Sequence, residues 1–464
     1  MKPHVIRLEG GALSPPSGQQ PAPTARRPPI GRVASWVAVF ALFAAATVTS
    51  LGAEPPAATN LTLATAVELA LRDNPDLRSL RARWEAMKER PAQAGALPNP
   101  MFKYGGMDTV SGGSWPDTNE KRFMIEQEFP WVGKRGLRAG IAAKDAEVAQ
   151  RELEAMTRDV VTMVKESYID LYAVQQVTAI TKDEEQVLQR MAKVAETLYV
   201  TGDRSQVDVI KAQSEITMQK QKLLELAGQQ SALKSKLNTL LNRRADAPLG
   251  PVVAPPEPEF GGAGATLFAQ AATNRPEVQA AQAQIDRYEL ERKLMAKESA
   301  SDYRLGVEYR DFGDSADMVM VTVSVDLPVW QSKYRAGVRE AAKMQESSRA
   351  ARESAERQSA FDVQDASSKV LTACRTLELY RAELIPQAEA RFGASEAAYR
   401  TGKVDFTDLL ESERFLLSAK IMAVMTEGTV GMQSARLDRA TGHEIKTGTP
   451  DATKAGEGGI EHGH

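Results

Sequence analysis

The chain has 464 residues, of which 26% are charged and only 6% aromatic, and its formal net charge at neutral pH is −3. This balance provides no basic surface of the kind that binds nucleic acid, and a single cysteine, Cys374, excludes an intrachain disulfide or a cysteine cluster. Long stretches rich in Ala, Glu, Gln, Lys, Arg and Leu, with apolar residues three or four apart, predict a mainly helical chain.

Residues 1–53 are predicted to be an N-terminal extension and a signal peptide. Positive charge precedes the apolar run from Trp36 to Ala46, and the small residues up to Ala53 suit cleavage by a signal peptidase. The run is shorter than the ~20 apolar residues that a spanning helix requires. An N-terminal membrane anchor is the alternative.

The rest of the chain is predicted to contain two similar halves, 54–245 and 265–442, joined by a linker rich in Pro and Gly at 246–264. Each half opens with a short helix that a proline interrupts, Pro75 in the first and Pro276 in the second, 276 − 75 = 201 positions later. Proline disfavours helix in the residue before it and suits the first turn of the next helix. The final stretch, 443–464, has no core pattern and is predicted to be disordered.

Each half continues with two segments in which apolar and charged side chains alternate. These segments are about 101–108 and 122–129 in the first half, and about 302–311 and 318–327 in the second. A period of two predicts strands with one apolar and one polar face, which is the pattern of a transmembrane β-barrel. A soluble sheet is the alternative, but the helices that follow are too long to fold back on so small a sheet.

A proline and a tryptophan lead out of each pair of strands into a very long helix, about 137–200 in the first half and about 336–400 in the second. Some 64 residues at ~1.5 Å each reach roughly 95 Å, far beyond a single globule. Pro386 interrupts the second of these helices. Return helices are predicted at about 204–242 and 404–441.

The long helices end in a repeated motif. Tyr-Val-Thr-Gly-Asp at 199–203 recurs as Tyr-Arg-Thr-Gly-Lys at 399–403, which is 399 − 199 = 200 positions later. An internal duplication accounts for this spacing. Because glycine permits the left-handed cap that ends a helix, the motif predicts the tip of a helical hairpin.

Two copies of this order of elements resemble the TolC family of outer-membrane efflux proteins over nearly all of residues 60–442. The resemblance implies a mixed α/β membrane protein of the outer membrane of a Gram-negative bacterium. In it, a homotrimer pools four strands per chain into one 12-stranded β-barrel, which a long periplasmic α-helical barrel continues. Open strand edges are not tolerated in lipid, so chains must pool strands, although strand count alone also allows an eight-stranded dimer.

The resemblance further implies a channel that receives substrate from a periplasmic adaptor and an inner-membrane pump of the RND type. The segments 97–100 and 129–135 look most like the heavy-metal branch, so the expected substrates are heavy-metal cations or small toxic compounds. The hairpin tips would dock on the adaptor through Tyr199, Thr201, Gly202, Asp203, Tyr399, Thr401, Gly402 and Lys403. A role for the tip tyrosines and glycines in shaping the turn alone is the alternative.

In this family, acidic residues just after the second tip surround the periplasmic gate, and Asp405, Asp408 and Glu411 match that place. Asp408 and Glu411 are three residues apart, so one helical face can carry both. Three copies around an axis would repel one another and select cations. The first repeat has Asp208 with Lys211, which breaks the acidic pair; a plain solvated face is the alternative for all three acids.

No enzyme activity, cofactor or metal site is predicted. GxxxxGK[ST], HExxH and GxSxG do not occur in the sequence, and the histidines near the carboxyl end, His443, His462 and His464, are too sparse to define a site. Two other functions remain open. One is an outlet for type I protein secretion with the same fold, and the other is a coiled-coil structural protein with no role in transport.

Overall fold

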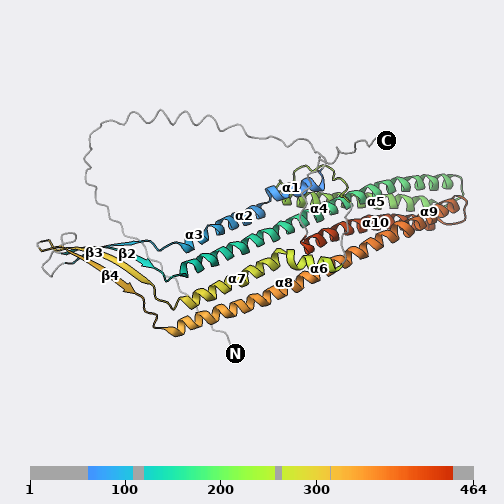
Figure 1. The fold of residues 1–464 in the computed structure, drawn as a ribbon. Coiled ribbons are helices and arrows are strands. Elements are labelled where there is room, and N and C mark those ends of the chain that lie inside the picture. The colour runs from blue at the N-terminus through green and yellow to red at the C-terminus, as the bar shows by residue number, and fades with distance from the viewer. Residues whose placement is uncertain (1–60, 108–119, 257–263, 314, 443–464) are drawn as a thin grey trace, which may run out of the picture. The chain divides into compact units, whose positions relative to one another are not determined.

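The computed structural model describes residues 61–107, 120–256, 264–313 and 315–442, all of which belong to the unit Ala58–His464 (Figure 1). The predicted signal peptide, the C-terminal tail and most of the loop between the first two strands lie outside the described residues. The first half contains α1 (Leu63–Asp73), α2 (Pro75–Lys88), α3 (Arg90–Gly95), β1 (Met101–Met107), β2 (Glu120–Phe129), α4 (Lys134–Val200) and α5 (Gln206–Leu240). The second half contains α6 (Gly264–Asn274), α7 (Pro276–Lys297), β3 (Tyr303–Asp311), β4 (Met318–Val325), α8 (Gln331–Leu379), a π-helical turn (Tyr380–Leu384), α9 (Ile385–Arg400) and α10 (Phe406–Thr441).

The predicted helix starts at the two prolines are confirmed. Asn74 ends α1 and caps α2, because its side-chain oxygen accepts the N–H groups of Asp76 and Leu77 at 2.9 and 3.2 Å. Pro75 then occupies the first turn of α2, and Pro276 does the same in α7. The fixed φ of proline therefore sets the same helix break in both halves.

The four strands form one antiparallel sheet in the order β1-β2-β3-β4. In its register, Ile125 lies opposite Phe102 and Val307 on the apolar face, whereas Met124 lies opposite Lys103 and Glu308 on the other face. The apolar side chains face outward with nothing packed on them in the described chain, so that Val321 is 71% exposed. The predicted strands are confirmed; β2 begins two residues earlier and β4 ends two residues earlier than expected.

The opposite face of the sheet is covered by ion pairs between neighbouring strands. Arg304 of β3 bridges Glu128 at 3.3 Å and Asp326 at 3.0 Å, and Lys103 of β1 pairs with Glu126 of β2. One face of the sheet is therefore apolar and the other is charged.

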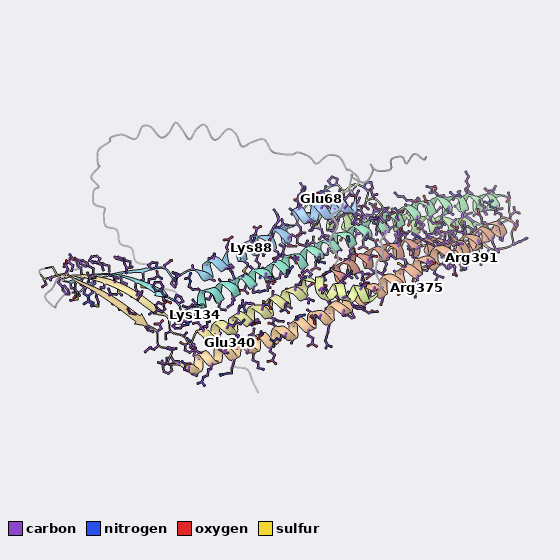
Figure 2. The ribbon with its side chains drawn as sticks, in the orientation of Figure 1. Glu68, Lys88, Lys134, Glu340, Arg375 and Arg391 are labelled. Carbon is purple, nitrogen blue, oxygen red and sulfur yellow. The ribbon has the colours of Figure 1, made fainter. Side chains whose placement is uncertain are left out.

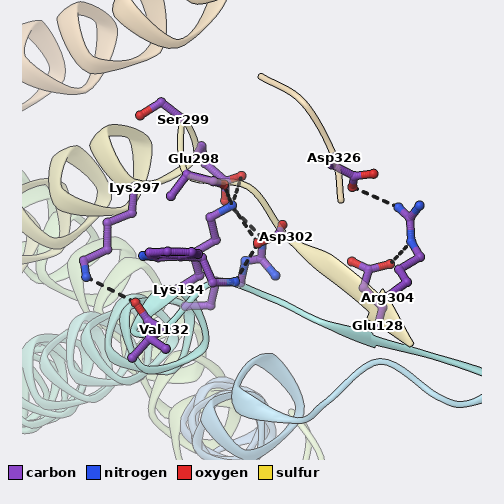
Figure 3. A network of polar contacts seen from close by, with 12 residues as sticks. Glu128, Val132, Lys134, Lys297, Glu298, Ser299, Asp302, Arg304 and Asp326 are labelled. Atoms are coloured by element: carbon purple, nitrogen blue, oxygen red, sulfur yellow. Dashed lines mark hydrogen bonds and ion pairs between the residues drawn. The ribbon is translucent and has the colours of Figure 1, made fainter. Parts of the chain in front are cut away.

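A buried lysine joins the sheet to the helices (Figure 3). Lys134, at the start of α4, is 1% exposed, and its Nζ donates to the carbonyl of Ala300 and to Oδ1 of Asp302, both at 2.9 Å. The same Asp302 oxygen accepts the backbone N–H of Trp131 at 2.6 Å, and Glu298 lies 3.6 Å from Nζ. This network fixes the exit from β2 and the entry into β3 against α4 and α7.

Helix α4 is the long central helix of this unit, with 67 residues and a length of roughly 100 Å at ~1.5 Å per residue. It packs against α5, α7 and α10. Figure 1 shows the strands at one end of these helices and the turns α4–α5 and α9–α10 together at the other end. Among the described helices, α10 alone has the length and apolar composition to cross a membrane, but it packs on α4, α8 and α9 here.

The second long helix is not continuous, as Pro386 predicted. The π-helical turn Tyr380–Leu384 separates α8 from α9 immediately before this proline. Pro386 has no N–H to donate to the carbonyl of Ala382, four residues earlier, and a wider turn accommodates that loss. Helix α8 also begins at Gln331, five residues earlier than expected.

The described part of the linker between the halves, up to residue 256, is held in place. Leu61 and Val252 form a parallel bridge, and the buried hydroxyl of Tyr168 in α4 donates to the carbonyls of Leu61 and Val253 at 2.7 and 2.8 Å. The described part of the linker is thus extended, as predicted, and fastened beside the start of α1.

Candidate functional site at the hairpin tips

The two copies of the repeated motif form the same turn. Gly202 and Gly402 adopt φ values of 84° and 78°, a left-handed conformation that costs other residues about 1–2 kcal/mol. Their N–H groups donate to the carbonyls of Tyr199 and Tyr399 at 3.0 and 3.1 Å. Each glycine therefore ends its long helix and reverses the chain, which confirms that both motifs are hairpin tips.

Seven of the eight predicted tip residues are exposed: Tyr199, Thr201, Gly202, Asp203, Thr401, Gly402 and Lys403. The eighth, Tyr399, is 1% exposed, whereas its counterpart Tyr199 is 44% exposed. The Tyr399 ring packs edge-on against Phe406 with centroids 5.5 Å apart. Burial, and then the charge of Asp208, raise the pKa of Tyr399 to about 12. Tyr399 thus supports the second tip from inside rather than presenting a surface to a partner.

Arg204 links the two hairpins directly. Its Nη2 donates to the carbonyl of Val404 at 2.7 Å, its guanidinium lies 4.9 Å from the centroid of the Tyr399 ring, and its Nη1 is 3.6 Å from Oδ1 of Asp405. Sequence reasoning did not single out Arg204, because its partners lie about 200 positions away. The only available signal was its place immediately after the first tip.

Two more residues of the first repeat reach the second hairpin. The hydroxyl of Tyr399 donates to Oδ2 of Asp208 at 3.4 Å, and Nζ of Lys211 donates to Oγ1 of Thr407 at 2.8 Å. Lys211, which in the sequence only breaks an acidic pair, therefore acts as a tie between α5 and α10.

The three predicted gate acids lie together at the start of α10. Asp405 is the N-cap residue, Asp408 lies in the first turn, and Glu411 follows three residues later. All three are exposed, and the side chain of Asp405 is 85% exposed despite its contact with Arg204. The structure thus brings together three carboxylates at the second tip that face solvent in the single chain. Among the described residues, no group of three His, Cys, Asp or Glu could hold a metal ion.

The sequence matches the family described as outer membrane efflux protein over residues 66–243 and 267–443. The chain belongs to this family, which confirms the expected resemblance and its association with outer-membrane transport. A curated relative is the cobalt-zinc-cadmium resistance protein CzcC of Cupriavidus metallidurans, 25% identical over 400 residues that cover 83% of this chain and 91% of that protein.

Solved structures show the same fold. CusC superimposes with a TM-score of 0.72 at 16% identity, covering 82% of this chain and 92% of that chain. The outer membrane protein VceC from Vibrio cholerae has a TM-score of 0.69 at 17% identity, with 82% of this chain and 96% of that chain covered. These similarities establish the architecture of the described unit as that of outer-membrane channels.

Proposed function

We propose that this protein is the outer-membrane channel of a tripartite efflux system, which passes substrate from a periplasmic adaptor and an inner-membrane pump of the RND type to the exterior. The observation that supports this most is the arrangement of the described unit. A sheet with one apolar face lies at one end of α4, and both hairpin tips lie at the other (Figure 1). A chain of this form can span an outer membrane and still reach far into the periplasm.

The sheet favours assembly as a homotrimer. Among the described residues, β1 and β4 each have an edge with no strand paired to it, and hydrocarbon cannot satisfy such edges. Three chains joined edge to edge would give a 12-stranded barrel with the valine-rich face toward lipid and the ion-paired face toward water. The helices would continue this barrel as a tube.

The exposed tip residues are the proposed docking surface for the adaptor. The proposed gate consists of Asp405, Asp408 and Glu411. The ties made by Arg204, Lys211 and Asp208 hold the second hairpin against the first. In a trimer, Asp408 and Glu411 would form rings of carboxylates around the entrance, which favour cations.

Heavy-metal cations are the proposed substrates, supported by the similarity to CzcC, a cobalt-zinc-cadmium resistance protein. Deletion of the gene should lower tolerance of cobalt, zinc, cadmium or copper, and the wild-type gene should restore it. Unchanged tolerance of these metals and of a panel of drugs would refute an efflux role. A missing extracellular protein in the same strain would instead indicate the secretion outlet, and a chain found outside the membrane fraction would indicate the structural protein.

A further inference from the structure

A buried carboxyl group lies behind the gate acids. Glu413 follows Glu411 by two residues on α10 but points into the protein, where it is 1% exposed. Neither of its carboxyl oxygens accepts a hydrogen bond from a donor among the described groups. An ionised carboxylate in that position would be strongly disfavoured, because burial removes its hydrating water and no hydrogen-bond donor replaces that water.

The charged side chains that act on Glu413 come from α4, α5 and α10 and are mostly acidic. They are Glu184 on α4, Glu215 on α5 and Arg414 on α10. The side chain of Glu215 is 7% exposed and is already paired with the Arg414 guanidinium, through Nε and Oε2 at 3.3 Å and through a second contact of Nη2 with Oε1. Arg414, the cation among these described neighbours, is therefore already engaged with Glu215.

Glu184 is the group that can complete the site. Its Oε1 is also buried and lacks a donor among the described groups, and its side chain lies within hydrogen-bonding reach of Glu413. A single proton supplies the hydrogen bond that both carboxyl groups lack, since a protonated Glu413 can donate its O–H to Glu184. Burial raises the pKa of Glu413 to about 10, with further contributions from the hydrogen bond to Glu184 and from the charges of Glu184 and Glu215. At neutral pH the pair therefore holds one proton.

We propose that Glu413 and Glu184 form a proton-binding site that helps to hold the second hairpin against the first, so that α10 packs less firmly on α4 when the shared proton is lost. The absence of any three-ligand cluster among the described residues favours a proton over a metal ion as the occupant. The consequence for the entrance rests on the proposed function: because Glu413 shares α10 with Asp408 and Glu411, loss of the proton would let the gate acids move.

The sign of the pH dependence follows from the raised pKa. The stability that this site contributes is complete below the ordinary pKa of a glutamate, decreases as the pH rises, and is lost as the pH passes the folded pKa of about 10. Glutamine at position 413 mimics the protonated acid and its amide can donate to Glu184. Glu413→Gln should therefore raise the melting temperature at pH 7 and flatten its dependence on pH between 5 and 10.

The test uses the purified full-length protein. Infrared spectra at pH 7 should show the carbonyl band of a protonated carboxyl group in the wild type, which disappears above about pH 10 and is absent in Glu413→Gln. Glu411→Gln, an exposed neighbour, should leave the band unchanged. Glu184→Gln removes one negative neighbour and should lower the pH at which the band disappears, which keeps the test valid if Glu413→Gln does not fold.

An identical band in the wild type and in Glu413→Gln would overturn the proton site. Channel conductance in planar bilayers tests the fastening: it should rise in the wild type above about pH 10 and stay constant in Glu413→Gln, and equal profiles would overturn that role. The infrared and melting measurements do not depend on transport, so a failure of the metal-tolerance test would leave them intact.

Discussion

The guanidinium of Arg204 in the first hairpin lies over the ring of Tyr399 in the second, 4.9 Å from its centroid, although the two residues are 195 positions apart. The same side chain donates to the carbonyl of Val404 at 2.7 Å. One residue of the first repeat thereby holds both the ring and the backbone of the second tip. This makes Arg204 the contact whose loss should release the second hairpin most directly.

Replacing Arg204 with alanine should loosen the entrance and raise single-channel conductance in planar bilayers. A hydrogen bond from a charged donor contributes about 1.5–3 kcal/mol, and the cation–π contact about 0.5–1 kcal/mol more. Arg400→Ala is the matched control, because Arg400 is an exposed arginine of the second tip that pairs with Glu396 in its own helix. Equal conductance in the two variants would contradict the role of Arg204 as a tie.

Neutralising the gate acids should reduce cation selectivity. Asp408→Asn and Glu411→Gln remove exposed carboxylates near the second tip while keeping side-chain size, so the ratio of potassium to chloride permeability should fall in each and fall further in the double variant. The reversal potential across a KCl gradient measures this ratio. Glu225→Gln, an exposed acid on α5 that pairs with Lys222, should leave it unchanged. A double variant with the wild-type ratio would mean that these acids form only a solvated face.

Lysine on the two faces of β4 should have opposite effects. Val321 lies on the apolar face, and its neighbour Thr322 lies on the polar face opposite Gly306. Lys at position 321 would face lipid at a cost of about 2–4 kcal/mol near the membrane centre, whereas a lumen position tolerates it. Val321→Lys should therefore abolish the heat-modifiable trimer on gels, and Thr322→Lys should keep it. If both variants assembled equally well, the sheet would not be a membrane barrel.

Removal of the buried lysine at the junction should destabilise the protein. Figure 2 shows Lys134 where α4 meets the strands. Lys134→Met would leave Asp302 and Glu298 without their buried ammonium partner, and the lost charged hydrogen bonds correspond to about 1.5–3 kcal/mol. A clear decrease in melting temperature is expected. Lys343→Met, which removes a lysine with a side chain that is 79% exposed, should cause none, and a similar decrease in both would refute the structural role of Lys134.

Much of this fold could be predicted from the sequence because its determinants are local. Pro75 and Pro276 set helix starts through their own fixed φ, Gly202 and Gly402 set the tips through their left-handed φ, and period-two alternation marks the strands on either side of a turn. None of these requires knowledge of a distant neighbour. The order of elements, the hairpin tips and the two faces of the sheet therefore followed from the residues themselves.

The tertiary structure alone decided which residues of the tips are buried and which are joined. Tyr199 and Tyr399 occupy the same place in the repeated motif, yet only Tyr399 is covered, by Arg204 and Phe406. Glu411 and Glu413 are two residues apart, which at ~100° per residue places them on opposite sides of α10. Which side meets solvent and which meets Glu184 depends on how α10 packs against α4, and sequence spacing within one helix carries no information about that contact.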